Sequence, residues 1–203
     1  DAAPSKWAPH PAAKHYKSAT AARRPPQNAH AFMKHMNKAS SPKVAELALV
    51  GAALTKQTVT EIAHRLQDDS SGLTALDLSH ASIGATGCKI LEAGIRKATK
   101  MHGHSAKGGL VSLKLSHNKI GSAGVQCLVR VLVQARNASL LRLDVSSNEI
   151  TDAGAGELAE LVAQHPTLAL LAVGDNRFGV RGTERLLASA RAPKSPLLQL
   201  RGC

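Results

Sequence analysis

The stretch LVSLKLSHNKIGSAGVQCLVRVL, residues 110–132, decides the fold of this chain. Leu113 and Leu115 alternate with polar residues, as a strand with one buried face requires. After Ile120, apolar side chains recur at the spacing that forms one face of a helix. Polar residues and a glycine separate the two halves, where a turn is expected. The stretch therefore predicts one strand followed by one helix.

The same frame recurs along the chain. It starts again at residues 73, 140 and 168, and a degenerate copy starts at residue 44. With a last start at residue 197, the spacings between successive starts are 29, 37, 30, 28 and 29 residues. Ala81 replaces the Asn of the second unit, and the first unit lacks both the Asn and the Gly. A repeat of this length predicts a solenoid in which each unit packs on the next.

The physics of the frame predicts how the units stack. No single unit can bury its leucines, so neighbouring units build a common core. The Asn side chain can bond backbone groups where the chain turns away from the strand, and the Gly allows close packing where the helix begins. We predict an α/β solenoid with parallel strands on one face and helices on the other. Its strands are expected at residues 47–49, 76–78, 113–115, 143–145, 171–173 and 197–200.

These residues resemble the ribonuclease-inhibitor-like class of leucine-rich repeats. The likeness lies in the pattern LxxLxLxxNxIxxxGxxxLxxxL and in repeat lengths near 28 or 29 residues, and it covers about 160 of the 203 residues. The resemblance implies protein recognition, commonly on the strand face, and no chemistry or cofactor of its own. Function must then come from positions that the frame leaves free.

Composition points to an acidic partner. The chain holds 26 Lys and Arg against 14 Asp and Glu, a formal net charge of +12. This favours nucleic acid, an anionic membrane or an acidic protein surface. No apolar run approaches the ~20 residues that cross a bilayer, so no transmembrane segment is predicted. Three cysteines without a CxxC indicate reduced, structural thiols, and a start at Asp1 indicates a processed form or a fragment.

Residues 1–42 differ in composition from the repeats. They hold seven Lys and Arg against one acid, a net charge of +6, and six prolines that interrupt any helix. Such a segment cannot bury enough apolar area to offset the entropy of ordering it. We predict an extended, disordered basic tail at residues 1–42, followed by a solenoid of five repeats plus a terminal strand at residues 43–203.

The tail also holds Trp7, Tyr16 and Phe32, three of the four aromatic residues of the chain. Interleaved with cations, they are suited to anchor an extended tail on a partner or to stack on exposed bases. The alternative is a solvated tail with incidental aromatics. A mitochondrial presequence, or the tail left after its cleavage, is a further interpretation. The histidines of the tail follow no metal-binding spacing.

The strand positions that face away from the core are bland. In chain order they are Glu46, Ala48, Ala75, Asp77, Ser112, Lys114, Arg142, Asp144, Leu170, Ala172, Gln199 and Arg201. They are small or of alternating charge, and none is aromatic, whereas strong interfaces are usually anchored by Trp, Tyr or Arg. This disfavours a high-affinity inhibitor of the ribonuclease-inhibitor kind.

Two basic segments lie outside the frame. The second unit is roughly eight residues longer than its neighbours, and the extra length falls around RKATKMHGHSAKGG, residues 96–109. We expect a basic contact loop there, carrying Arg96, Lys97, Lys100 and Lys107, or else a solvated loop. Its HGH sequence supplies two metal ligands, too few for a site.

Near the C-terminal end, Arg177, Arg181 and Arg185 are four residues apart, so Arg181 and Arg185 should share a helix face. Arginine suits phosphate groups and acidic protein surfaces. A solvated helix surface is the alternative.

The sequence contains no P-loop, GxGxxG, HExxH or GxSxG motif, and the Ser-His pairs Ser79–His80 and Ser116–His117 recur with the frame. We therefore predict no enzymatic activity, no cofactor and no metal site.

The predicted function is a scaffold or interaction subunit of a large assembly. A ribonucleoprotein such as a mitochondrial ribosome, in the mitochondrial matrix, is favoured, with RNA and protein subunits as partners. Alternatives are an axonemal or microtubule-associated protein of the cytoskeleton that binds acidic tubulin, and an accessory subunit of a mitochondrial membrane complex. Besides the two segments above, the residues predicted to contact the partner are Lys6, Trp7, Lys14, Tyr16, Lys17, Arg23 and Arg24.

Overall fold

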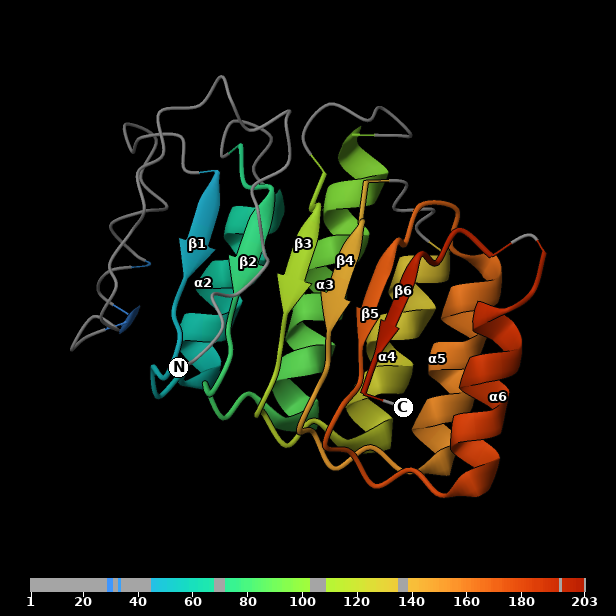
Figure 1. The fold of residues 1–203 in the computed structure, drawn as a ribbon. Helices are drawn as coiled ribbons and strands as arrows, with labels where there is room; N and C mark the ends of the chain where they lie inside the picture. Colours follow the sequence, from blue (N-terminus) through green and yellow to red (C-terminus); the bar gives the residue numbers. More distant parts are fainter. Residues whose placement is uncertain are drawn as a thin grey trace, which may run out of the picture.

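The computed structural model describes residues 29, 30, 33, 45–67, 72–102, 109–134, 139–193 and 195–202, with the side chains of residues 99–102 outside that description. Within these ranges six strands alternate with five helices (Figure 1). Their bounds, in chain order, are β1 Glu46–Ala48, α2 Lys56–Gln67, β2 Ala75–Asp77, α3 Gly84–His102, β3 Ser112–Lys114, α4 Gly121–Gln134, β4 Arg142–Asp144, α5 Asp152–Gln164, β5 Leu170–Ala172, α6 Val180–Ala190 and β6 Gln199–Arg201.

The six strands form one sheet in chain order, and every neighbouring pair is parallel. The helices lie side by side in a layer behind this sheet (Figure 1). The parallel α/β solenoid predicted from the repeats is confirmed, and each of the first five strands begins one residue earlier than expected.

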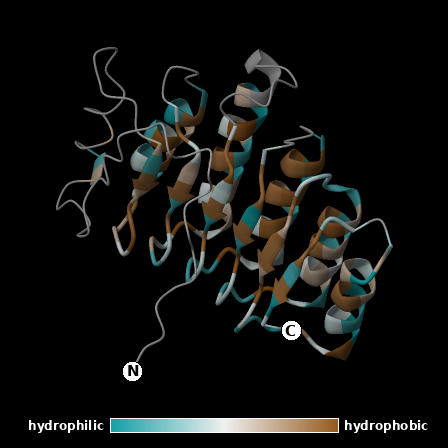
Figure 2. Ribbon diagram, turned by 45° about the horizontal axis from the view of Figure 1, so that its top comes forward, coloured by the Kyte–Doolittle hydropathy of each residue, from teal (hydrophilic) through white to brown (hydrophobic). Residues whose placement is uncertain are grey.

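The core lies between the two layers. The register aligns the central leucine of every strand, so Leu113 is paired with Leu76 on one side and with Leu143 on the other. Each of these side chains is at most 1% exposed. Hydrophobic residues, brown in Figure 2, follow the strands and helices along the stack. The core is aliphatic, as the low aromatic content requires.

The buried asparagines join each turn to the turn of the preceding repeat. Asn118 accepts hydrogen bonds at Oδ1 from the backbone N–H groups of Ala81 (2.9 Å) and Ile83 (3.2 Å). Its Nδ2 donates to the carbonyls of Leu78 (2.7 Å) and Leu115 (3.0 Å). The same pattern recurs at Asn148 and Asn176. These ladders confirm the role predicted for the Asn of the frame.

In the turn of the second repeat Ala81 stands in place of Asn, and the described hydrogen bonds from this turn to the turn of the first repeat come from the backbone. The N–H of Leu54 donates to the carbonyl of Ala81 at 3.4 Å, and the N–H of Ala52 turns back to Leu49 at 3.2 Å. The atypical first repeat therefore keeps its turn with backbone bonds in place of the asparagine ladder.

Helix α3 corrects the expectation of a basic loop after residue 95. It runs for 19 residues to His102, so Arg96 and Lys97 lie on a helix. The physical reason is local: Arg, Lys, Ala and Met favour helices, and the next glycine is Gly103. Part of the extra length of the second unit therefore lengthens helix α3, which runs to His102.

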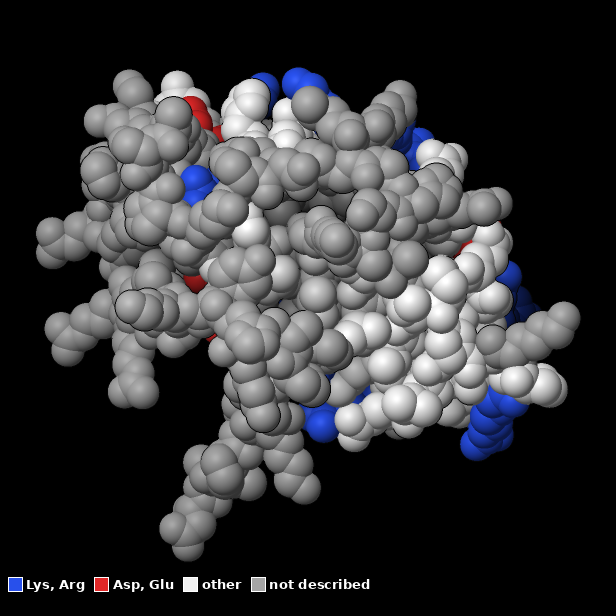
Figure 3. Space-filling view, turned by 90° about the horizontal axis from the view of Figure 1, so that it is seen from above, with Lys and Arg blue, Asp and Glu red and all other residues white. Residues whose placement is uncertain are grey.

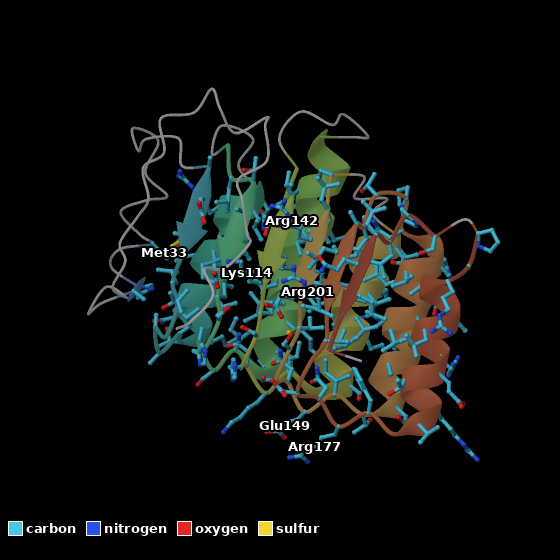
Figure 4. The ribbon with its side chains drawn as sticks, in the orientation of Figure 1. Met33, Lys114, Arg142, Glu149, Arg177 and Arg201 are labelled. Atoms are coloured by element: carbon cyan, nitrogen blue, oxygen red, sulfur yellow. The ribbon has the colours of Figure 1, made fainter. Side chains whose placement is uncertain are left out.

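Three residues of the predicted tail fall within the described part of the chain. Ala29, His30 and Met33 are helical, and Met33 is fully buried in the same core cluster as Leu47. Figure 4 shows Met33 beside β1. No periodic pattern in the sequence predicts this contact. The other residues of 1–42 lie outside the described residues, so the extended tail stays a prediction.

The asparagine ladders generate a stability prediction. Replacing Asn148 with Ala leaves the buried N–H groups of Asn118 and Ile120 without their acceptor. Each such loss costs about 1–3 kcal/mol. We expect the thermal midpoint, measured by circular dichroism, to fall by roughly 5–10 °C.

The matched control is Gln164→Ala, which removes an exposed amide that bonds only along its own helix. Its midpoint should stay within about 1–2 °C of the parent. An Asn148→Ala protein that melts with this control would show that the ladder does not hold the repeats.

Candidate functional site

The sheet face carries acids and cations in equal number, and two of them form an ion pair. Lys114 on β3 forms an ion pair with Asp77 on β2 at 3.0 Å, and Asp77 also accepts a hydrogen bond from the Ser79 hydroxyl at 2.7 Å. Asp144 accepts from the N–H of Ser146 at 3.0 Å. Figure 4 shows Lys114, Arg142 and Arg201 on this face. The bland face expected from the sequence offers no excess of either sign.

The helix layer differs from repeat to repeat in charge. Helix α5 carries Asp152, Glu157 and Glu160 and no Lys or Arg. The neighbouring repeats on both sides carry mainly cations, on α3 with α4 and on α6. In the view from above, the described Lys and Arg side chains, coloured blue, lie at separate places on the rim of the molecule (Figure 3). Two basic surfaces are therefore present, separated by an acidic helix.

The first basic surface is built around one carboxylate and is called here the Glu92 cluster. It consists of Lys89, Glu92, Arg96 and Lys97 on α3 together with Arg130 on α4. The Glu92 side chain is 9% exposed, whereas those of Arg96 and Arg130 are 45% and 50% exposed. The buried acid thus lies beneath two half-exposed guanidinium groups.

Glu92 holds both arginines by hydrogen bonds. Arg96, one helical turn further along α3, donates from Nη2 to Oε1. Arg130 donates from Nε to Oε1 and from Nη2 to Oε2, each at 3.2 Å. These bonds to Glu92 raise the pKa of Arg130 above its usual value. Both guanidinium groups are therefore held in place by the buried carboxylate.

A shallow groove lies beside the bonded pair. Lys89, Glu92, Ala93, Arg96 and Lys97 line it. Sequence reasoning found Arg96 and Lys97 but missed the other charged residues. The repeat frame gives a signal for them, because Leu91 and Leu128 occupy the same frame position in consecutive repeats and are both buried. Glu92 comes one residue after Leu91, and Arg130 comes two residues after Leu128. Stacked helices bring such positions together.

The second basic surface is on α6. Arg181 and Arg185 are exposed and one turn apart, which confirms the predicted shared helix face. A Cβ atom at Gly156 of α5 would lie 2.9 Å from Nη1 of Arg185, so this guanidinium packs directly over the glycine. Arg177 lies before the helix and forms an exposed ion pair with Glu149 at 3.4 Å (Figure 4).

The start of α6 is held by the preceding repeat. Asp152, in the first turn of α5, accepts hydrogen bonds from the N–H groups of Gly179 (2.6 Å) and Gly182 (3.2 Å). The carboxylate thus caps a neighbouring helix, whose N-terminal end attracts negative charge. At Gly182 a Cβ would meet Asp152 Oδ1 at 2.4 Å, so only glycine fits this contact.

The side chains of Cys88, His80 and His117 pack against other parts of the repeats. Burial, with a smaller contribution from Cys127, raises the pKa of the Cys88 thiol to about 12, so it stays protonated at neutral pH. His80 and His117 occupy equivalent turns, and their rings stack at 4.0 Å. In the described part of the chain no three His, Cys, Asp or Glu side chains are placed to hold a metal. Over the same residues, no helix combines the length and apolar content needed to cross a membrane.

Several predicted contact residues lie outside the described residues. They are Lys6, Trp7, Lys14, Tyr16, Lys17, Arg23, Arg24 and Lys107, together with the side chain of Lys100. Their roles stay predictions.

Parallel strands, a helix after each of the first five strands and asparagine ladders define a repeat scaffold of the kind that presents surfaces to other macromolecules. Comparison with known families agrees: a family model described as Leucine Rich repeat matches residues 70–91, 110–129 and 136–159. The chain contains leucine-rich repeats. As in that class, its supported role is protein interaction.

Among solved structures, the chain is similar to one described as Leiomodin-1 Actin-Binding Site 2 (ABS2), with a TM-score of 0.54 and 16% sequence identity. The match covers 79% of this chain and 87% of that one. At this identity the likeness concerns the fold. A search of curated proteins finds no match.

The cap on α6 yields a prediction. Asp152→Ala removes the acceptor for two N–H groups at the start of the helix that presents Arg181 and Arg185. We expect a loss of about 1 kcal/mol in the free energy of unfolding, measured by urea denaturation. Amide exchange in the first turn of α6 should accelerate as well.

Glu160→Ala, an exposed acid further along α5, is the control and should leave both quantities nearly unchanged. If the two variants behave alike, Asp152 does not cap α6.

Proposed function

We propose that this protein is a non-catalytic scaffold subunit of a large ribonucleoprotein, and that it meets RNA with its helix layer. A mitochondrial ribosome, in the mitochondrial matrix, is the assembly we favour. The observation that carries the proposal is the placement of charge. The sheet face is balanced, whereas the Glu92 cluster holds four cations against one acid.

The exposed cations suit a phosphate backbone. Contacts to phosphates supply much of the affinity of nucleic-acid-binding proteins, because each one releases a condensed counterion. Arg96 and Arg130 are half exposed, and Lys89 and Lys97 are exposed. Arg181 and Arg185 offer a second set of contacts one repeat beyond the acidic α5. Two such surfaces on one rigid layer can hold two segments of a folded RNA.

The tail adds to the proposed contacts. Its net charge of +6 is half of the excess of the whole chain, and Trp7 and Tyr16 lie among its cations. We propose that Lys6, Lys14, Lys17, Arg23 and Arg24 neutralise phosphates while an aromatic ring stacks on a base.

A cytoskeletal role is the second candidate. The similar leiomodin-1 domain is described as an actin-binding site. The same cations that suit phosphate would suit an acidic filament, whether actin or tubulin. Protein subunits of a mitochondrial membrane complex are the third candidate partner, and they too would present an acidic surface to these cations.

Isolation of the native particle tests the proposal. The tagged full chain is recovered from its own cells at low salt and sedimented with and without ribonuclease. We expect it in a fast-sedimenting particle that contains RNA. Ribonuclease should release the protein, and so should raising the salt concentration, because phosphate contacts weaken steeply with salt.

A catalytically inactive ribonuclease serves as the control. Sedimentation that survives active ribonuclease and instead follows actin or tubulin filaments would contradict the ribonucleoprotein and favour the cytoskeletal role.

A further inference from the structure

We propose that the Glu92 cluster is a phosphate-binding site, and that Glu92 is the positioning residue that aims its two guanidinium groups. The ligand is a backbone phosphate of single-stranded RNA, an assignment that rests on the proposed function. Nothing in the repeat frame requires these side chains, because they occupy helix positions outside the repeat pattern.

The number of cations around Glu92 exceeds what a buried acid needs. Arg130 already binds both carboxylate oxygens, through Nε and Nη2. This two-point pairing neutralises the acid. Arg96 adds a second guanidinium on Oε1, and Lys89 and Lys97 stand exposed on the same helix. Four positive charges against one negative leave the cluster at +3.

Donors remain on both guanidinium groups. Within the described residues, Nη1 of Arg130 and both Nε and Nη1 of Arg96 have no acceptor. Both side chains are about half exposed, so these N–H groups can reach a ligand. Because the opposite edges are held by Glu92, little side-chain entropy is lost when an anion binds. A tetrahedral phosphate accepts several such bonds at once.

The shape of the groove favours a phosphate that belongs to a polymer. It is shallow and is lined along one face of α3 by Lys89, Ala93 and Lys97, with Arg96 beside them. A small free anion is usually enclosed, whereas a backbone lies across an open surface with one phosphate over the fixed arginines. The flanking lysines then stand near the adjacent phosphates.

The decisive variant is Glu92→Gln, which removes a negative charge but keeps the shape of the side chain. If the cluster were only a sum of charges, this change would strengthen binding to RNA. If Glu92 aims the arginines, the change weakens binding. The matched control is Glu160→Gln, which removes one negative charge at an exposed position of α5.

Affinity is measured by fluorescence anisotropy on the full chain, with a labelled single-stranded oligouridine RNA as the probe. We expect Glu92→Gln to lose roughly threefold to tenfold in affinity, and Glu160→Gln to stay equal or gain slightly. Equal gains in the two variants would overturn the positioning role.

Arg130→Gln should lose about tenfold, and the slope of log affinity against log salt should fall by about 0.7, one phosphate contact on a single strand. Lys56→Gln, an exposed cation at the start of α2, controls for the loss of one charge. Lys97→Gln tests the same groove from an exposed position, so a fold defect in the Glu92 or Arg130 variants does not remove the test. Arg130→Gln and Lys97→Gln proteins that both bind as tightly as Lys56→Gln would overturn the site.

Two further results separate the site from the proposed function. A parent protein that fails to bind the RNA at low salt contradicts the proposed function and this site with it. A parent that binds RNA with an affinity unaffected by Glu92→Gln or Arg130→Gln contradicts the site alone. Binding of poly-glutamate that Arg130→Gln weakens, with RNA binding intact, would reassign the cluster to an acidic protein.

Discussion

The structure depends on hydrogen bonds that pass from the turn of one repeat to the turn of the next. Asn118, Asn148 and Asn176 each bond backbone groups of their own turn and of the preceding one. A leucine-rich unit cannot bury its core by itself, so its stability comes from its neighbour. Once the turns are fixed, the strands are in register, the central leucines meet, and each helix stacks on the one before it.

The same stacking creates the surface. Glu92 and Arg130 are 38 residues apart in sequence, yet consecutive helices bring them within hydrogen-bond distance. Asp152 reaches Gly179, 27 residues further on, in the same way. Charged side chains on consecutive helices therefore lie next to one another. Because α5 carries acids between the cations of α3 with α4 and those of α6, the helix layer has two separate basic surfaces. Because the sheet face has no net charge, the excess positive charge of the described repeats lies mostly on the helix layer.

The fold could be predicted because its signal is local. Leu113 and Leu115 have counterparts in every complete unit, and the first five strands lie within one residue of their predicted bounds, whereas β6 begins two residues later than predicted. The Glu92 cluster could be predicted only in part, because it is made between units: Arg96 and Lys97 stand out as a run of cations, whereas Glu92 and Arg130 gain their meaning from the packing of α3 on α4. The extension of α3 was misread as a loop because an insertion suggests one, although its residues favour a helix. Met33 lies outside the repeat frame, so its burial had no periodic signal.

Lysine footprinting of the native assembly tests the central claim most directly, that the partner lies against the helix layer. The free chain and the purified assembly are acetylated under the same conditions, and the modification of each lysine is compared by mass spectrometry. The account predicts strong protection of Lys89 and Lys97 in the assembly, with Lys114 on the sheet face labelled equally in both states. Protection of Lys114, with Lys89 and Lys97 labelled as in the free chain, would contradict it.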